Sequence, residues 1–238
     1  NITLVDLAQV PGGPSSPNLM LNLLIALVGG IVVAGVAVFA LEQFDEGLKS
    51  PGDVKLVTGL PLLGAIPAIE DDENPADLVV DPKTEIAEAY LTVRSNLAFS
   101  TDKGVPRTLM VTSTRPAEGK STTSFAIANV LARTGKRVLL IDADMRSPSL
   151  HGFFNTENTA GFSDFLSNQA ELGSLIRDVG VQNLSFLSAG RTPPSAAELL
   201  SSDRPLELIE ALSAQFDHVV IDAPPLLGIA DATLLARA

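Results

Sequence analysis

The sequence predicts an α/β protein with a doubly wound, mostly parallel sheet and flanking helices, built around a phosphate-binding loop and preceded by one transmembrane helix. Three observations support this fold class. Apolar strands alternate with helices from about residue 85, a Glu-Gly-Lys-Ser turn joins the first strand to a helix, and a 23-residue apolar run covers residues 19–41. Apolar strands that do not alternate, separated by helices, indicate a parallel sheet covered on both faces.

The apolar run from Leu19 to Leu41 is predicted to cross a membrane. At about 1.5 Å per residue, a helix of this length spans roughly 34 Å, enough for the hydrocarbon core of a bilayer. The alternatives are a buried helix of a soluble protein and a signal peptide, but no basic residue precedes the run and its core is too long for a signal. Lys49 and Lys55 follow it, so the positive-inside rule places the C-terminal side in the cytoplasm.

This orientation divides the chain into four predicted segments. A proline-rich periplasmic segment covers residues 1–18, and the transmembrane helix covers 19–41. Residues 42–84, which contain an acidic cluster, form a cytoplasmic linker, and 85–238 form the phosphate-loop domain. Clustered acids without histidine are more typical of a solvated linker than of a metal site.

Composition excludes several classes of function. The chain of 238 residues has no cysteine, so disulfides, thiolate metal sites and cysteine catalysis are absent. Its formal net charge of −12 argues against nucleic acid as the main partner, because phosphate backbones are bound by basic patches. A triphosphate must therefore be held by a local site rather than attracted by a broad positive field.

The elements of the predicted domain follow from local patterns. Helical spacing places the apolar residues of 85–99 on one face, and a second helix over 121–135 ends at Gly135. Short apolar strands are predicted in four segments, 107–113, 137–142, 183–190 and 218–225. Ligands of such sheets bind at the carboxyl ends of the strands.

The turn after the first predicted strand has the residues of a triphosphate site. The predicted nucleotide-binding set is Glu118, Gly119, Lys120, Ser121 and Thr122. Backbone N–H groups at a helix N-terminus bind phosphate, the lysine reaches the β- and γ-phosphates, and the serine hydroxyl ligates Mg²⁺. An ordinary strand–helix turn with an exposed lysine is the alternative, which the position between an apolar strand and a helix disfavours.

Three aspartates follow predicted strands near this loop. Asp142 and Asp144 end the second strand, and Asp222 ends the fourth. Two carboxylates two residues apart face the same side of an extended chain, so one suits Mg²⁺ and the other suits a proton acceptor. A helix N-cap or a loop turn is the alternative for each aspartate alone. Three such acids around one phosphate loop favour a site.

Together these segments resemble a known family. "TSTRPAEGKSTT", "VLLIDADMRSP" and "VVIDAPP" are similar to the Walker A, A′ and B motifs of the bacterial tyrosine kinases (BY-kinases) of capsule and exopolysaccharide export. "GRTPPSAAELL" resembles the family's segment between A′ and B. "PSSPN" with the apolar run resembles the second membrane span of the chain-length (polysaccharide co-polymerase) part, and "SPGDVKLVTGLPLLGAIP" resembles its linker.

The resemblance implies an ATP-dependent protein-tyrosine kinase that regulates polysaccharide polymerisation and export from the bacterial inner membrane, with its kinase domain in the cytoplasm. ATP and Mg²⁺ are the implied cofactors. Lys120, Asp142 and Asp144 are the catalytic candidates, Asp142 as the proton acceptor, and Ser121, Asp144 and Asp222 are the metal candidates. The implied partners are further copies of the kinase domain and the polysaccharide machinery in the membrane, but no nucleic acid.

Two other functions fit the same residues. One is a membrane-tethered ATPase switch, because the fold is shared with partitioning and division-site ATPases. The other is a structural chain-length protein with a vestigial nucleotide site. The membrane span argues against the first, and the intact Lys120, Asp142, Asp144 and Asp222 argue against the second.

The sequence departs from the family pattern in several places. Ala117 replaces a glycine before Glu118, which requires that this position not need a positive φ. Leu91 replaces the first arginine of the interface motif that begins at Glu88, which predicts weaker or different self-association, and Arg115 stands where the partitioning ATPases have a signature lysine. Tyr90 is the only tyrosine, and the family has further sheet and a tyrosine-rich tail beyond the position of Ala238, so the chain is expected to be part of a longer protein.

Overall fold

The computed structural model describes residues 12–13, 16–43, 51–70 and 73–237 of the chain. The chain divides into two compact units, Asn1–Leu60 and Pro61–Ala238. Most of the predicted proline-rich segment over 1–18 lies outside the described residues.

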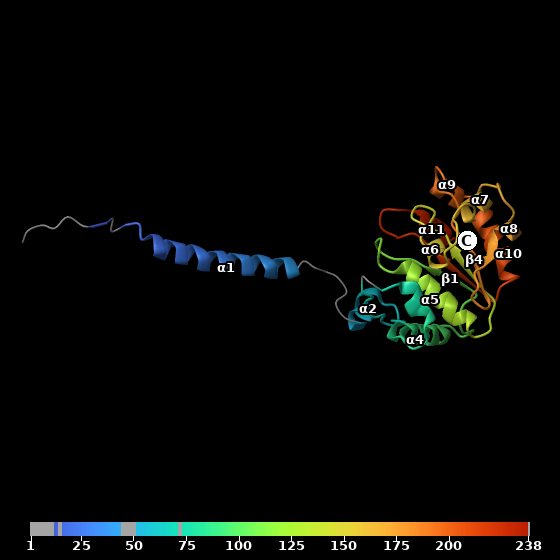
Figure 1. Ribbon diagram of the computed structural model, residues 1–238, viewed down its shortest axis with the longest axis horizontal. Coiled ribbons are helices and arrows are strands. Elements are labelled where there is room, and N and C mark those ends of the chain that lie inside the picture. Colours follow the sequence, from blue (N-terminus) through green and yellow to red (C-terminus); the bar gives the residue numbers. More distant parts are fainter. Residues whose placement is uncertain (1–11, 14–15, 44–50, 71–72, 238) are drawn as a thin grey trace, which may run out of the picture. The chain divides into compact units, whose positions relative to one another are not determined.

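The first unit contains the apolar helix. Helix α1 (Leu19–Gln43) includes a stretch, Leu19–Leu41, that is long and apolar enough to cross a membrane (Figure 1), the one such helix among the described residues. Its large apolar side chains are exposed, as expected for side chains that face lipid. A short helix, α2 (Pro51–Thr58), follows within the predicted linker.

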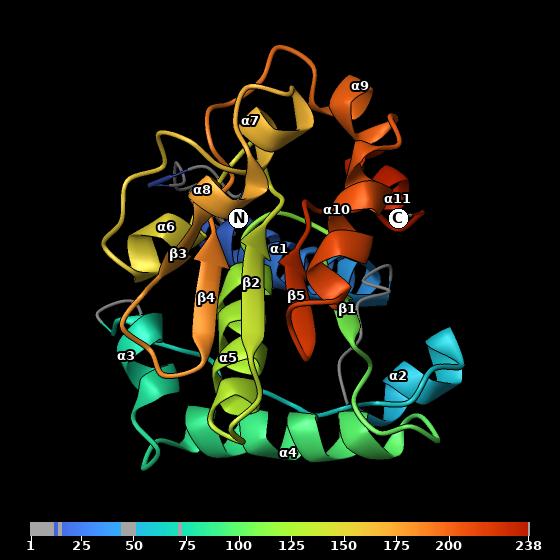
Figure 2. The same ribbon diagram turned by 90° about the vertical axis from the view of Figure 1, so that its right-hand side faces the viewer.

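The second unit is built on a five-stranded, mostly parallel sheet in the order β1-β5-β2-β4-β3 (Figure 2). The strands are β1 (Thr108–Val111), β2 (Val138–Asp142), β3 (Ile176–Asp178), β4 (Leu184–Leu187) and β5 (His218–Asp222). Four of them are parallel and fall within the four predicted segments. β3 is the exception: it pairs antiparallel with β4 at the edge, and its three residues are too few to show a pattern in sequence.

Helices cover both faces of this sheet because successive strand residues point to opposite sides. In β2, Val138 and Leu140 join one buried cluster while Leu139 and Ile141 join the other. The first cluster includes α3 (Pro75–Val80), α4 (Glu85–Phe99), α5 (Lys120–Ala132) and the start of α6 (Leu150–Phe153). The second includes α7 (Phe162–Leu166), α8 (Leu172–Leu175), α9 (Ala196–Leu200), α10 (Arg204–Ser213) and α11 (Asp231–Leu235).

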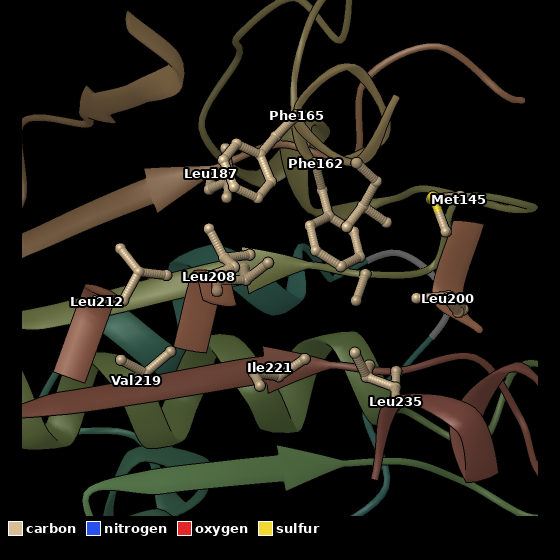
Figure 3. Packing of buried hydrophobic residues seen from close by; sticks show 14 of the residues in the cluster. Met145, Phe162, Phe165, Leu187, Leu200, Leu208, Leu212, Val219, Ile221 and Leu235 are labelled. Carbon is tan, nitrogen blue, oxygen red and sulfur yellow. The ribbon is translucent and has the colours of Figure 1, made fainter. Parts of the chain in front are cut away.

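Packing on the second face is shown in Figure 3. Leu208 and Leu212 of α10 lie beside Val219 and Ile221 of β5, and all four side chains are buried. Burial of one such side chain contributes about 1.5–3 kcal/mol. A buried hydrophobic cluster on each face of the sheet therefore fixes the strands whose ends carry the aspartates.

The second compact unit begins at Pro61, inside the segment 42–84 that the sequence assigns to a linker. The boundaries of the four predicted segments stay predictions. Helix α3 starts at the N-cap Asn74 and buries Ala76 and Val79 in the same cluster as α5. Only six residues long, α3 is too short for a helical periodicity to stand out in sequence.

Ala117 contradicts the expectation for its backbone. Its φ is 63°, in the left-handed region that favours glycine. The Glu118 carboxylate accepts N–H bonds from Thr114 at 2.8 Å and from Arg115 at 3.0 Å. These bonds fold the loop back on itself, so the chain reverses at Ala117 although the residue there is not a glycine.

We therefore expect Ala117→Gly to stabilise the domain by about 1 kcal/mol, because glycine adopts a positive φ without strain. Ala211→Gly, at an exposed position in α10, is the matched control and should destabilise by about 0.5–1 kcal/mol. Urea unfolding followed by circular dichroism measures both. A loss of stability in Ala117→Gly equal to that in the control would contradict a strained Ala117.

Candidate nucleotide site

The sheet order brings the predicted site residues to three neighbouring strands. β1 leads into the loop before α5, while Asp222 and Asp142 are the last residues of β5 and β2. In the parallel register Asp222 pairs with Val111 on one side and with Asp142 on the other. Residues that are distant in sequence therefore meet at one carboxyl edge, the usual ligand edge of such sheets.

The loop is preorganised as an anion site. Gly119 caps α5 with φ 78°, and α5 is a thirteen-residue helix whose N-terminus carries partial positive charge. Gly119, Lys120, Ser121 and Thr122 line a cavity of about 420 Å³. Glu118, also in the predicted binding set, turns its carboxylate toward the backbone N–H groups of its own loop. Glu118 therefore holds the loop in shape through these two bonds.

Lys120 lies among carboxylates. Its Nζ is 2.8 Å from Asp144 Oδ2 and 3.5 Å from Asp222 Oδ2, and its side chain is only 10% exposed. The ordinary turn with an exposed lysine is therefore not what the structure contains. Burial alone lowers the pKa of Lys120, but the carboxylates of Asp222, Asp144 and Asp142 together raise it above the ordinary value. The ammonium stays charged.

Asp222 is held by two serine hydroxyls. Ser121 Oγ donates to Asp222 Oδ2 at 2.6 Å, and Ser124 Oγ donates to Asp222 Oδ1 at 3.0 Å. Burial raises the pKa of Asp222, while Lys120 and the two hydroxyls oppose that rise. Ser124 is missing from the predicted set, although its position three residues after Ser121 on one helix places both on the same face.

Asp142 is fully buried and does not line the cavity. Its carboxylate accepts backbone N–H bonds from Asp144, Ser149 and Leu150, each at 3.2 Å. Burial, followed by repulsion from Asp222, raises the pKa of Asp142 to about 7. Asp144 lines the cavity, whereas Asp142 and Asp222 are fully buried. Asp142, the last residue of β2, and Asp144 thus differ in whether they line the cavity.

The oxygen atoms around Ser121 fit a magnesium ion. Ser121 Oγ lies 2.6 Å from Asp222 Oδ2 and 2.9 Å from Ser149 Oγ, and Lys120 joins this group to Asp144. The described residues contain no group of three or more His, Cys, Asp or Glu side chains suited to a metal. Mg²⁺ is usually bound through one or two carboxylates together with substrate phosphates and water. Ser121, Asp144 and Asp222 provide the protein's part of such a site, and phosphates and water would complete it.

Two further residues beside the cavity were not predicted. Arg146 lines it, and the Arg146 guanidinium forms an ion pair with Asp231 at 2.6 Å. The arginine lies within the quoted A′ segment, so it was visible in sequence. Asp231 is 85 residues away and belongs to no motif, so only the fold identifies it.

The single tyrosine lies close to the loop but is not accessible. Tyr90 on α4 is 2% exposed, and its hydroxyl is 3.0 Å from Thr123 Oγ1 on α5. Burial raises the pKa of Tyr90, and the bond to Thr123 partly offsets the rise. The neighbouring Leu91 packs partly against the same core, so this position is used in part for packing within the domain.

Comparison with known proteins shows which family and fold the chain is similar to. The model of the AAA domain family matches residues 107–238. The tyrosine-protein kinase YwqD of Bacillus subtilis is 40% identical over 159 residues, which cover 67% of this chain and 67% of that protein. The solved kinase domain of the Escherichia coli tyrosine kinase ETK is 29% identical, with a TM-score of 0.73 over 80% of this chain and 79% of that one.

A longer relative shows how much of such proteins the chain represents. A tyrosine-protein kinase assigned to the cps region of Klebsiella pneumoniae is 30% identical over 260 residues, which span this whole chain but only 35% of the relative. The chain therefore spans about a third of the length of such relatives. The motifs, the fold and these similarities lead to one conclusion: the chain belongs to the family of bacterial tyrosine-protein kinases.

Proposed function

We propose that this chain is the membrane-anchored kinase part of an ATP-dependent protein-tyrosine kinase that regulates polysaccharide polymerisation and export. The observation that carries the proposal is the position of Lys120, at the N-terminus of α5 and between Asp144 and Asp222, in a cavity at the carboxyl edge of the sheet. Membership of the kinase family and the apolar helix of Leu19–Leu41 support the enzyme class and the inner-membrane location.

In the proposed reaction the chain contributes position and charge. The backbone N–H groups at the start of α5 and Lys120 Nζ would hold the phosphates of ATP, and Ser121, Asp144 and Asp222 would hold Mg²⁺. Mg²⁺, when bound, neutralises the charge of the β- and γ-phosphates. Ser124 fixes the second oxygen of Asp222, and so orients that carboxylate.

Transfer to tyrosine also needs a proton acceptor. The acceptor oxygen bonds to the γ-phosphorus while the bond to the bridging oxygen breaks, ADP leaves, and the hydroxyl proton passes to a base. We assign this base to Asp142, because a group with a pKa of about 7 is well matched to proton transfer near neutral pH. Asp144 is the rival, because it lines the cavity and Asp142 is fully buried.

The acceptor tyrosine is proposed to lie outside the described domain. Tyr90 is buried, and its hydroxyl contacts Thr123 rather than the cavity. Phosphorylation would place a doubly charged group inside the core. The proposed partners are other copies of the protein and the membrane polysaccharide machinery. The first would supply the acceptor tyrosine, and the second is the machinery that the kinase would regulate.

The ATPase switch remains the second candidate, because the same residues would serve transfer to water. Both functions need Lys120 and the three aspartates, so the acceptor alone distinguishes them. An assay that measures free phosphate beside phosphotyrosine separates the two.

Lys120→Met should abolish the turnover of Mg²⁺-ATP or weaken its binding. Loss of a charged hydrogen bond to phosphate weakens binding by about 10- to 100-fold. Calorimetric titration of the whole chain in detergent measures the affinity, and Lys136→Met, at an exposed lysine, is the control. Because Lys120 neutralises buried carboxylates, the variant should also lose stability, which thermal unfolding checks. An unchanged affinity would exclude the phosphate-loop assignment.

Asp142→Asn and Asp144→Asn should divide the two carboxylate roles. Asp142→Asn is expected to retain Mg²⁺-ATP and to slow tyrosine phosphorylation by about 10²- to 10⁴-fold, whereas Asp144→Asn should lose affinity as well. Binding isotherms are measured beside single-turnover phosphorylation of an added tyrosine peptide. Equal loss of affinity in both variants would assign both acids to the metal and remove Asp142 as the base.

The raised pKa of Asp142 predicts how stability depends on pH in Mg²⁺-free buffer with EDTA. Between about pH 4 and pH 7 the unfolded chain has this carboxyl ionised while the folded protein keeps it protonated. Unfolding then releases a proton, so the stability that Asp142 contributes is present below pH 4 and is lost as pH rises through 7. Relative to Asp142→Asn, the wild type should lose on the order of 4 kcal/mol over this window. Parallel stability curves in urea unfolding would contradict the shift.

A further inference from the structure

Arg146 and Asp231 form a bidentate ion pair at the edge of the nucleotide cavity. Arg146 Nε is 2.6 Å from Asp231 Oδ2, and Arg146 Nη2 is 3.0 Å from Asp231 Oδ1. The Asp231 side chain is 2% exposed, whereas that of Arg146 is 47% exposed. The carboxylate is thus fixed in the core, and a large part of the guanidinium remains accessible.

The accessible part of Arg146 belongs to the cavity. Among the residues that line the cavity, Lys120 and Arg146 are the two with positive charge. Two of the five guanidinium N–H groups bond to Asp231, which leaves three without a partner among the described residues. A planar guanidinium matches the oxygens of a phosphoryl group, and its remaining donors are held in a fixed direction by the bidentate pair.

The backbone also fixes Arg146 relative to the rest of the site. Its N–H donates to Asp144 Oδ1 at 3.3 Å, and the N–H of Ser147 donates to the same oxygen at 3.0 Å. The other oxygen of Asp144 contacts Lys120 Nζ at 2.8 Å. A short chain of bonds therefore sets where the guanidinium lies relative to the lysine.

We propose that Arg146 is a further catalytic residue, which donates hydrogen bonds to the transferred phosphoryl group, and that Asp231 is the positioning residue that aims its guanidinium. The inference rests on the proposed phosphoryl transfer. As the acceptor oxygen bonds to the γ-phosphorus and ADP leaves with the bridging oxygen, negative charge on the phosphoryl oxygens is stabilised by donors that are already in place. The acceptor proton passes to the base proposed above, so Arg146 itself gives up no proton.

A structural clamp between the A′ loop and α11 is the competing explanation. A clamp needs the ion pair between Arg146 and Asp231 but makes no use of the remaining guanidinium N–H groups. Loss of the ion pair would then lower stability and would affect ATP binding and transfer to the same degree. A catalytic guanidinium predicts a specific loss in the rate of transfer, even where lysine preserves the charge.

The experiment compares Arg146→Lys, Arg146→Gln and Asp231→Asn with the wild type, using the whole chain in detergent. Affinity for Mg²⁺-ATP, thermal unfolding, phosphotyrosine on an added peptide and free phosphate are measured for each. Arg204→Lys is the matched control, since Arg204 forms an ion pair with Glu207 at 3.0 Å and does not line the cavity.

Arg146→Lys and Arg146→Gln should each lower the rate of transfer by about 10²-fold, with affinity for Mg²⁺-ATP changed only severalfold. Asp231→Asn, which keeps the guanidinium but loosens it, should lower the rate less and should leave affinity unchanged. Arg204→Lys should transfer at the wild-type rate. A structural clamp would not lower the rate of transfer while leaving affinity and stability nearly unchanged.

A wild-type rate in Arg146→Lys, or a loss of the same size in Arg204→Lys, would overturn the role of Arg146 while the proposed kinase function stands. If the wild type releases phosphate but labels no tyrosine, the kinase proposal fails, and the loss of phosphate release in Arg146→Lys still supports the arginine. A wild type with no turnover in either assay would overturn both.

Discussion

The parallel register of β2 and β5 places Asp142 beside Asp222, and both carboxylates are fully buried. Two adjacent buried anions are unstable unless their charge is reduced or compensated. Asp142 responds with a pKa of about 7, while Lys120 and two serine hydroxyls compensate Asp222. The ammonium and the two hydroxyls therefore compensate a buried charge of the sheet itself, before any ligand is considered.

This constraint explains which parts of the site were predictable. The loop, the four parallel strands and the acids at their ends are local patterns, each readable within about ten residues, and the structure confirms the fold they predict. Ser149 and Asp231 were not predictable, because each matters only through a partner that the fold brings near: Ser121 for one and Arg146 for the other. Spacing in a single sequence carries no signal for such contacts.

Other features of the fold have physical causes that spacing does not show. Helix α3, inside the predicted linker over 42–84, has only six residues, and its stability comes from burying Ala76 and Val79 against the domain and not from helical propensity. The expectation for Ala117 was wrong because a backbone preference was weighed without the bonds that Glu118 makes to its own loop. Those bonds offset the strain of a left-handed alanine, which costs on the order of 1 kcal/mol.

Charge alone does not separate a kinase from an ATPase, because a phosphoryl group needs the same compensation whichever oxygen accepts it. The lining of the cavity bears on this difference, because it contains Phe153, Pro225 and Ile229 as well as Lys120 and Asp144. An apolar wall binds water poorly and packs well against an aromatic ring. Exclusion of water from a charged site also strengthens every electrostatic contact within it. In the proposed reaction, these apolar residues would favour tyrosine over water as the acceptor, for a reason independent of the motifs that identify the family.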